Sequence, residues 1–377
     1  MGTVQRLATE ARVNEYAGLE QNPDVPWLPD EFARDAAECQ DAECQDAGAA
    51  ILHFHGRQPG GAPDHRFESY RDTILATRAG CDALIHPTLG YVTVGATAEQ
   101  RIANILRLAQ DPATRPEFAP MDMDSTNVDG YDLAERRYTT KGLIYRNGTE
   151  TLEYFAEAIH AQAMAPYLVA WNIGFTRQIG AFPDMGLRRG PAYVCFCLTG
   201  RAMLAGHPGT AEGLDAYTRF LPQGHAVEWT ACNFNGDLLK LTEETITEGG
   251  HVSIGLGDYA YAEYGRPTNA ELIRRVADQA RSLGREVATP PEARAILGVP
   301  GQVMPDHAPL SPARNVPAPG AEAQFGLLRT MTLICRFELR TTELFLDGTV
   351  KGTAHSSVGR RRLPRVRAWP CGPAISS

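Results

Sequence analysis

Eight short apolar runs recur along the first 300 residues, and each is followed by a stretch with apolar side chains at helical spacing. The runs are rich in β-branched and aromatic residues, as buried strands are. No Gly-x-Gly-x-x-Gly segment opens a helix after an early strand, which argues against a doubly wound sheet. The sequence therefore predicts an α/β fold, a (β/α)₈ barrel, over residues 1–300. The predicted strands are 12–17, 49–55, 83–86, 118–123, 166–171, 192–198, 227–232 and 251–256.

Eight helices are predicted to follow these strands, and Asn269 is placed to cap the last of them. Their expected ranges are 28–47, 67–78, 98–109, 151–164, 176–185, 211–220, 238–248 and 269–283.

The alternation stops after Pro300. The next 20 residues are rich in proline and have no helical period, a composition typical of linkers. Farther on, the three consecutive arginines at 360–362 supply no apolar side chains for a hydrophobic core. We expect residues 301–377 to be a Pro/Arg-rich tail outside the barrel, linker-like or disordered, with a partner-binding appendage as the alternative.

Composition excludes several classes of protein. A net charge of -9 disfavours a nucleic-acid binder, which needs a basic face. No apolar run approaches the roughly 20 residues of a membrane span, and the first residues carry no secretion signal. The eight cysteines are expected to be reduced in a cytoplasmic protein, and Cys195 and Cys197 to pack on one face of a strand.

The sharpest local feature is His53-Phe54-His55, which closes the second predicted strand. Residues two apart in a strand point to the same side, so both imidazoles should project at the strand's carboxyl end. Active sites of barrel enzymes lie at this end. Two neutral imidazoles side by side suit zinc or another divalent metal. Hydrogen-bonded structural histidines are the alternative.

The eighth predicted strand leads through a glycine-rich segment to Asp258. Glycines let backbone and ligand approach closely, and a carboxylate at a strand end is a candidate base or metal ligand. Capping of the next turn is the alternative.

Taken in order, these segments resemble the β-keto acid cleavage enzyme family, whose best-known activity is 3-keto-5-aminohexanoate cleavage. The resemblance extends over residues 8–299. It rests on His53-Phe54-His55-Gly56-Arg57, Gly249-Gly250-His251-Val252, Asn269-Ala270-Glu271-Leu272 and the segment 283–294.

The resemblance implies a zinc-dependent (β/α)₈ barrel that condenses a β-keto acid with acetyl-CoA. The adduct then splits in retro-Claisen fashion into acetoacetate and a new CoA thioester, so that the enzyme is an acyltransferase that cleaves a carbon–carbon bond. His53 and His55 match the family's metal-binding histidines, and Asp258 matches its catalytic base. A homo-oligomer, specifically a tetramer, is also implied.

Two positions depart from the family pattern. Gly257 stands where the family has a glutamate metal ligand, and Ser253 where it has an arginine that supports the base. A catalytic zinc usually has three protein ligands, so either Glu15 or Asp258 is a candidate to complete the set. Without the arginine, Asp258 lacks that cationic neighbour.

Three further residues resemble family positions that contact the substrate: Glu15 at the first strand, Thr88 after the third and Asn127 after the fourth. Surface, hydrogen-bonding or turn-capping roles are the alternatives.

Two other functions stay open beside β-keto acid cleavage. One is a catalytically altered protein that binds a small carboxylate without turnover. The other is a metal-assisted hydrolase or aldolase that needs no CoA. In each case the partner is a small molecule, and neither nucleic acid nor membrane is expected.

Overall fold

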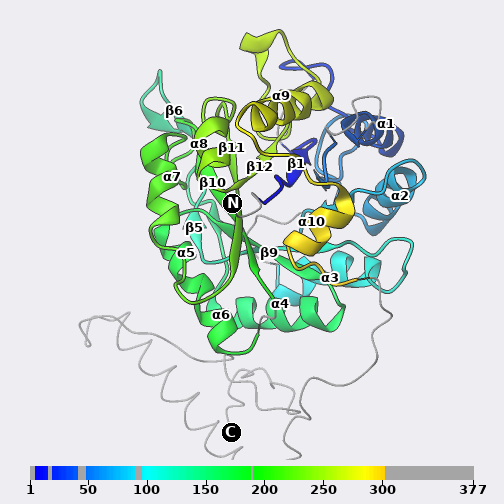
Figure 1. Cartoon of the computed structure of the whole chain (residues 1–377), viewed down its shortest axis with the longest axis vertical. Helices are drawn as coiled ribbons and strands as arrows, with labels where there is room; N and C mark the ends of the chain where they lie inside the picture. The colour runs from blue at the N-terminus through cyan, green and yellow to red at the C-terminus, as the bar shows by residue number, and fades with distance from the viewer. Residues whose placement is uncertain (1–4, 16–18, 41–47, 90–95, 188–189, 302–377) are drawn as a thin grey trace, which may run out of the picture. The chain divides into compact units, whose positions relative to one another are not determined.

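Eight parallel β-strands form a ring at the centre of the barrel (Figure 1). A computed structural model describes residues 5–15, 19–40, 48–89, 96–187 and 190–301. Neighbouring strands follow the order β3-β2-β1-β12-β11-β10-β9-β4, so the predicted (β/α)₈ barrel is confirmed. The strands are β1 (Thr9–Arg12), β2 (Ile51–Phe54), β3 (Leu84–Pro87), β4 (Phe118–Asp122), β9 (Ala165–Ala170), β10 (Ala192–Thr199), β11 (Val227–Phe234) and β12 (His251–Ile254).

The two strands at the ends of this order, β3 and β4, meet beside Glu117. Its amide donates a 3.0 Å hydrogen bond to the Ile85 carbonyl, and its side chain accepts one of 2.8 Å from the Ile85 amide. Arg78 and Arg294 form ion pairs of 3.0 Å and 2.8 Å with the same buried carboxylate. Glu117 thus provides hydrogen-bond partners for the Ile85 amide and carbonyl at the edge of β3, where the barrel closes.

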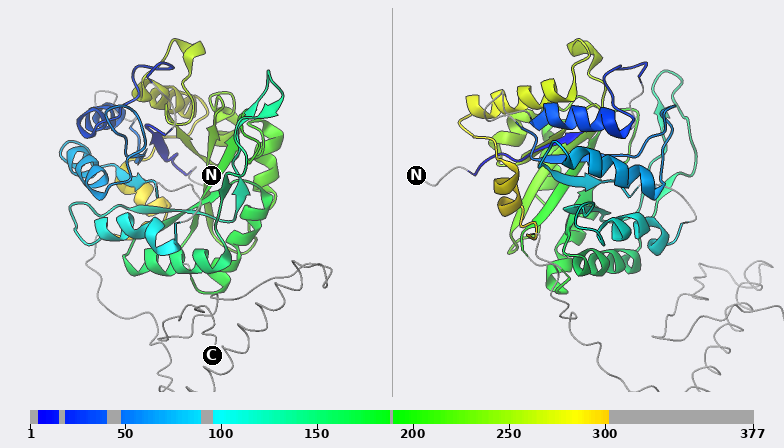
Figure 2. Two further views of the ribbon diagram at one scale, coloured as in Figure 1. Left: turned by 180° about the vertical axis from the view of Figure 1, so that it is seen from behind. Right: turned by 90° about the vertical axis from the view of Figure 1, so that its right-hand side faces the viewer.

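Helices surround the strands on the outside, as Figure 2 shows from behind and from the side. The helices that follow β1 to β12 in turn are α1 (Pro29–Gln40), α2 (Phe67–Arg78), α3 (Ala98–Leu108), α4 (Thr149–Ala161), α5 (Ile173–Ile179), α6 (Ala181–Asp184), α7 (Ala211–Thr218), α8 (Thr242–Thr247) and α9 (Asn269–Ser282). Two short hairpin pairs, β5 (Thr126–Asn127) with β8 (Ile144–Tyr145) and β6 (Tyr131–Asp132) with β7 (Arg137–Tyr138), lie between β4 and α4. A three-residue 3₁₀ turn, η1 (Ala262–Tyr264), precedes α9.

The prediction for the first strand was wrong by three residues at its start and five at its end. It placed the strand at 12–17, whereas β1 spans Thr9–Arg12. This strand carries Glu10 and Arg12, and both are buried by contacts from other strands. A prediction based on local apolar runs cannot detect a strand whose charged side chains are buried in this way.

The predicted cap of the last barrel helix was also wrong by one residue. Thr268 caps α9, because its hydroxyl accepts from the Glu271 amide while the Glu271 side chain accepts from the Thr268 amide. Asn269 is fully buried instead, and its amide group joins Leu256, Val13 and Asp35 by hydrogen bonds.

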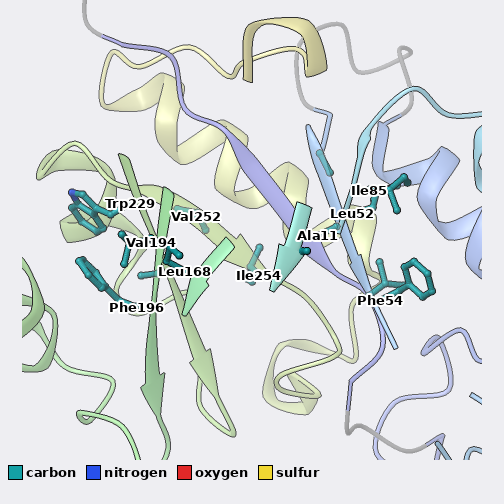
Figure 3. Packing of buried hydrophobic residues seen from close by; sticks show 14 of the residues in the cluster. Ala11, Leu52, Phe54, Ile85, Leu168, Val194, Phe196, Trp229, Val252 and Ile254 are labelled. Atoms are coloured by element: carbon teal, nitrogen blue, oxygen red, sulfur yellow. The ribbon is translucent and has the colours of Figure 1, made fainter. Parts of the chain in front are cut away.

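Side chains on the two faces of the strands build two separate cores. Those on the outer face fill the layer beneath the helices (Figure 3). Those on the inner face fill the barrel, and they include Cys195 and Cys197, which share one face of β10 as predicted. At the base, Ala293 of α10 (Pro290–Ile296) and Leu297 join the inner cluster. The amino ends of the strands are therefore plugged, and the carboxyl ends are left for function.

Among the described helices, none has both the length and the apolar character needed to cross a lipid bilayer. The chain divides into two units after Ala308, and every described residue lies in the first. The predicted tail falls, except for Gly301, outside the described residues.

Candidate active site

Three of the side chains singled out from the sequence converge at the carboxyl ends of β1 and β2. His53 lies within β2, His55 directly follows it, and Glu15 follows β1. The His53 and His55 Nε2 atoms are 3.2 Å apart, and Glu15 Oε1 is 3.4 Å from His55 Nε2. One ligand atom from each residue thus lies within 4.8 Å of the other two.

The hydrogen bonds of His53 fix which of its nitrogens is free. Its Nδ1 lies 2.9 Å from the His86 carbonyl oxygen, which only accepts hydrogen bonds, so Nδ1 carries the hydrogen. The lone pair is left on Nε2, which points to His55 and Glu15. Metal-binding histidines are commonly oriented by this type of bond to a backbone carbonyl.

Backbone contacts also hold His55 and Glu15 in place. The buried Asn14 side chain accepts a 3.0 Å hydrogen bond from the His55 amide and donates one of 2.7 Å to the Pro26 carbonyl. Arg57 donates a 2.5 Å hydrogen bond to the Glu15 carbonyl. The segment after β1 is thereby fixed against the end of β2.

The chemistry of these donors fits a divalent metal ion. Zinc–nitrogen bonds of about 2.0–2.1 Å in tetrahedral geometry place two nitrogens roughly 3.3 Å apart. The two Nε2 atoms lie at nearly this separation. Burial lowers the pKa of both His53 and His55 well below the usual range, and the nearby Arg12 charge adds to this. Both imidazoles are therefore neutral near pH 7, as metal ligands must be.

A second group of potential ligands, Glu10 and His86 with the shared His53, lies deeper in the barrel, and hydrogen bonds already surround its carboxylate. Glu10 is fully buried and takes a 2.7 Å contact from His86 Nδ1. The hydroxyls of Tyr167 and Ser253 each donate a 2.5 Å hydrogen bond to it. Because the His86 carbonyl accepts from His53, this buried network also supports the orientation of the first imidazole.

Asp258 lies beside the cluster of His53, His55 and Glu15, and Arg12 joins it to Glu15. Arg12 Nε is 2.7 Å from Asp258 Oδ2, and Arg12 Nη2 is 2.7 Å from Glu15 Oε2. Neither Asp258 oxygen accepts a well-aligned hydrogen bond from the described residues. Burial raises the pKa of Asp258 well above its usual range, and the Arg12 guanidinium opposes this effect. Burial thus favours the protonated acid, whereas the Arg12 ion pair favours the carboxylate, which is the form that could take a proton.

The close packing at Gly257 explains why this position carries no side chain. A Cβ atom there would lie 2.7 Å from the Glu15 amide nitrogen and 2.8 Å from the Arg12 carbonyl oxygen. Any larger residue would displace the segment that carries Glu15. A carboxylate at position 257 and the present placement of Glu15 therefore exclude each other.

The two other predicted contacts are placed differently. Thr88 follows β3 at the same end of the barrel, with its amide 3.0 Å from the Phe54 carbonyl. Asn127 is exposed in β5, and its side chain closes a local turn with Asp129 through two 2.8 Å hydrogen bonds. The roles of both residues in substrate binding stay predictions.

Sequence reasoning missed Arg12 and Glu10 as parts of the site. The signal available was their alternation: two charged residues of opposite sign, two positions apart, in a strand that faces the barrel interior. It also missed Asp122 at the end of β4, whose carboxylate accepts a 2.6 Å hydrogen bond from the Trp171 indole.

Neutral imidazoles beside carboxylates, at the carboxyl end of a (β/α)₈ barrel, define the class of barrel proteins with a candidate active site for proton transfer, with side chains that could hold a metal ion. Comparison with known proteins narrows this class. Residues 9–299 match the beta-keto acid cleavage enzyme family. The chain belongs to this family, and it is an enzyme that cleaves carbon–carbon bonds by acyl transfer.

Characterised relatives are similar along nearly their whole length. The 3-keto-5-aminohexanoate cleavage enzyme of Fusobacterium nucleatum is 30% identical over 296 residues, which cover 78% of this chain and 97% of the relative. The 3,5-dioxohexanoate:acetyl-CoA acetone transferase of Paraburkholderia graminis is 26% identical, over 74% of this chain and 91% of the relative.

Solved structures of ObcA share the fold. The ternary complex of ObcA with a C4-CoA adduct and oxalate superposes with a TM-score of 0.56 at 15% identity, covering 73% of this chain and 68% of that chain. At this level of identity the likeness supports the barrel alone.

Proposed function

We propose that this enzyme condenses a small β-keto acid with acetyl-CoA and releases acetoacetate and a new CoA thioester, in a metal-dependent reaction. The cluster of His53, His55 and Glu15, with Asp258 adjoining through Arg12, is the observation that carries the proposal. Relatives with acetyl-CoA in their names support it, among them the 3-oxoadipate:acetyl-CoA acetyltransferase of Cupriavidus necator, which is 24% identical.

The proposed metal ligands are His53 and His55 through Nε2, and Glu15 through Oε1. Glu15 is favoured over Asp258 as the third ligand, because it lies 3.4 Å from His55 Nε2 and belongs to the same cluster. Three protein ligands leave a position open for substrate. A divalent ion held there would supply Lewis-acid polarisation of a substrate oxygen.

Asp258 is the proposed base. The most acidic carbon of a β-keto acid lies between its keto and carboxylate groups, and Asp258 would take a proton from it. This carbon then attacks the acetyl carbonyl and displaces the CoA thiolate. The thiolate then attacks the original keto carbon, and the bond between this carbon and the one that attacked the acetyl group breaks. Asp258 returns the proton to the latter carbon, which completes acetoacetate. All atoms of the two substrates are thus accounted for in the two products.

Thr88 and Asn127 are proposed to contact the substrate as the family resemblance implies, together with Glu15 at the edge of the metal site. We also propose a homo-oligomer, a tetramer by the same resemblance, which light scattering on the purified protein would test. The five described cysteines are unpaired, in keeping with a cytoplasmic location.

Metal analysis combined with turnover assays tests the proposed function. About one divalent ion per wild-type chain is expected, and loss of the ion in H53A and H55A. The matched control is H225A, whose imidazole lies in an exposed pair with Asp184. Product formation should stop when acetyl-CoA is left out. Turnover without acetyl-CoA would instead support a metal hydrolase or aldolase, and a metal-free wild type that binds keto acids without turnover would support a binding protein.

A further inference from the structure

Arg12 is a buried cation held between two carboxylates. It is 8% exposed and faces the barrel interior from β1. One guanidinium nitrogen lies 2.7 Å from Asp258 and another lies 2.7 Å from Glu15. Because the guanidinium is a rigid plane, these two contacts fix both carboxylates relative to each other.

The pairing of the first and last strands brings Asp258 to this cation. β1 and β12 are parallel neighbours, with Ala11 opposite Ile254. Beyond β12 the chain turns over Arg12, whose carbonyl accepts a 2.8 Å hydrogen bond from the Gly257 amide. A Cβ atom on Gly255 would lie 2.1 Å from the same carbonyl oxygen, so only glycine permits this approach.

Among the described residues, Ser253 in contrast makes its side-chain hydrogen bond to Glu10 and not to Asp258. It lies opposite Glu10 in the strand register and donates its hydroxyl to that residue. Within the described part of the chain, the one ion pair that Asp258 forms is with Arg12.

We infer that Arg12 is the positioning residue for the catalytic carboxylate, and that from the first strand of the barrel it takes the part that the family resemblance gives to an arginine at position 253. This inference rests on the proposed function of Asp258 as base. The same guanidinium aligns Glu15 with the imidazole pair, so a single side chain couples the proposed base to the proposed metal site.

Exchange of the cation between the two strands tests the inference. In R12S we expect kcat to fall about 100-fold, a typical contribution of a well-placed proton-transfer group, with KM for the keto acid changed less than threefold. R12K keeps the charge but loses the two-point geometry, so its kcat should stay at least tenfold low. In R12S/S253R the new guanidinium should restore kcat at least tenfold over R12S. The matched control is R219S, which removes an exposed 2.6 Å pair with Asp215.

Retention of kcat within threefold in R12S would overturn the inference, and so would a folded R12S/S253R without recovery. If the double variant does not fold, R12A assayed with millimolar guanidinium replaces it: added guanidinium should raise kcat, and no effect would count against Arg12.

Failure of the proposed function can be told apart from failure of this inference. If wild type turns over no β-keto acid, the unfolding free energies of R12S, D258N and R12S/D258N decide whether Arg12 holds Asp258. The two single effects should then not be additive, because the second substitution finds its partner already gone. Additive effects would show that Arg12 does not hold Asp258.

Discussion

At the scale of single residues, the site depends on charges that only tertiary contacts make tolerable. Asp258 and Glu10 are buried carboxylates and Glu15 is a half-buried one, and all three lie near one buried cation, Arg12. Burial raises the pKa of both Asp258 and Glu15, which disfavours ionising them together with Glu10. With neutral imidazoles, full ionisation of the three acids would set three negative charges against the single positive charge of Arg12. A divalent cation at the proposed position would balance this charge, which is a physical reason to expect a metal there.

Replacing the proposed base should separate catalysis from metal binding. In Asp258→Asn we expect kcat to fall about 10³-fold, because an amide cannot take the proton. The metal content should stay near that of wild type, since Asp258 is not among the proposed ligands. Parallel loss of the ion would instead identify Asp258 as the third ligand. D215N, at an exposed ion pair, is the control.

Asp35 should make stability depend on pH. Burial raises its pKa to about 7, although Asn269 donates a 2.9 Å hydrogen bond that opposes the shift. The folded protein therefore holds a proton that the unfolded chain releases between about pH 4 and pH 7. Its contribution to the unfolding free energy falls as pH rises through this window, by about 2–3 kcal/mol between pH 5 and pH 8.

The variant Asp35→Asn stays neutral and should lack this loss. Urea unfolding at pH 5 and pH 8 measures the effect: the variant should gain stability relative to wild type at the higher pH. An equal difference between the two proteins at both pH values would contradict the assignment.

At the scale of secondary-structure elements, Glu117 closes the barrel between β3 and β4. In Glu117→Ala, two arginines lose their partner and the Ile85 amide loses an acceptor. We expect the unfolding free energy to fall by about 3 kcal/mol, the usual effect of breaking a buried ion pair. E135A, in an exposed and long pair with Arg137, should change it by less than about 0.5 kcal/mol. Thermal unfolding of both variants gives the comparison.

Close approach of β1 and the end of β12 should make Gly257 intolerant of substitution. In Gly257→Ala, the added methyl group meets the backbone of Arg12 and Glu15, so we expect about 2 kcal/mol of destabilisation. Metal affinity should fall as well, because Glu15 moves. G80A, where a Cβ meets nothing within 4 Å, is the control. Unchanged metal binding in folded G257A would argue against Glu15 as a ligand.

Elements were predictable from sequence where burial is apolar. Seven of the strands fall on the predicted apolar runs to within a few residues, because a buried parallel strand needs such a run. The first was misplaced since Glu10 and Arg12 are buried by partners far along the chain. The cap at Thr268 could have been predicted from the sequence, because Thr-x-x-Glu at 268–271 is a capping-box motif.

The site was predictable only in part, because contacts between residues far apart in the sequence determine some of its geometry. The His53 and His55 pair follows from strand alternation, and Asp258 from its place at a strand end. The relation of Arg12 to Asp258 depends on strand order in a closed ring, which periodicity does not give. The Gly-Gly-His segment pointed to the family, yet His251 lies at the base of the barrel, where its Nδ1 accepts from the Ala8 amide.

At the scale of the whole molecule, we expect residues 309–377 to be dispensable for the barrel. The chain divides after Ala308, and the family match ends at residue 299. A protein ending at Ala308 should unfold within about 2 °C of the full chain and keep its kcat, since a 1 kcal/mol change shifts the midpoint by roughly 2–4 °C at this size. Calorimetry and turnover assays measure both. A lower midpoint would assign the tail a stabilising role.

The meeting of β1 with β12 has a consequence for how the protein is made. Since the first and last strands supply the two halves of one ion pair, a ribosome must deliver almost the entire barrel before that pair can exist. A nascent or prematurely terminated chain would hold both histidines but not Asp258. The protein can therefore acquire its proposed chemistry only after most of the barrel has been synthesised.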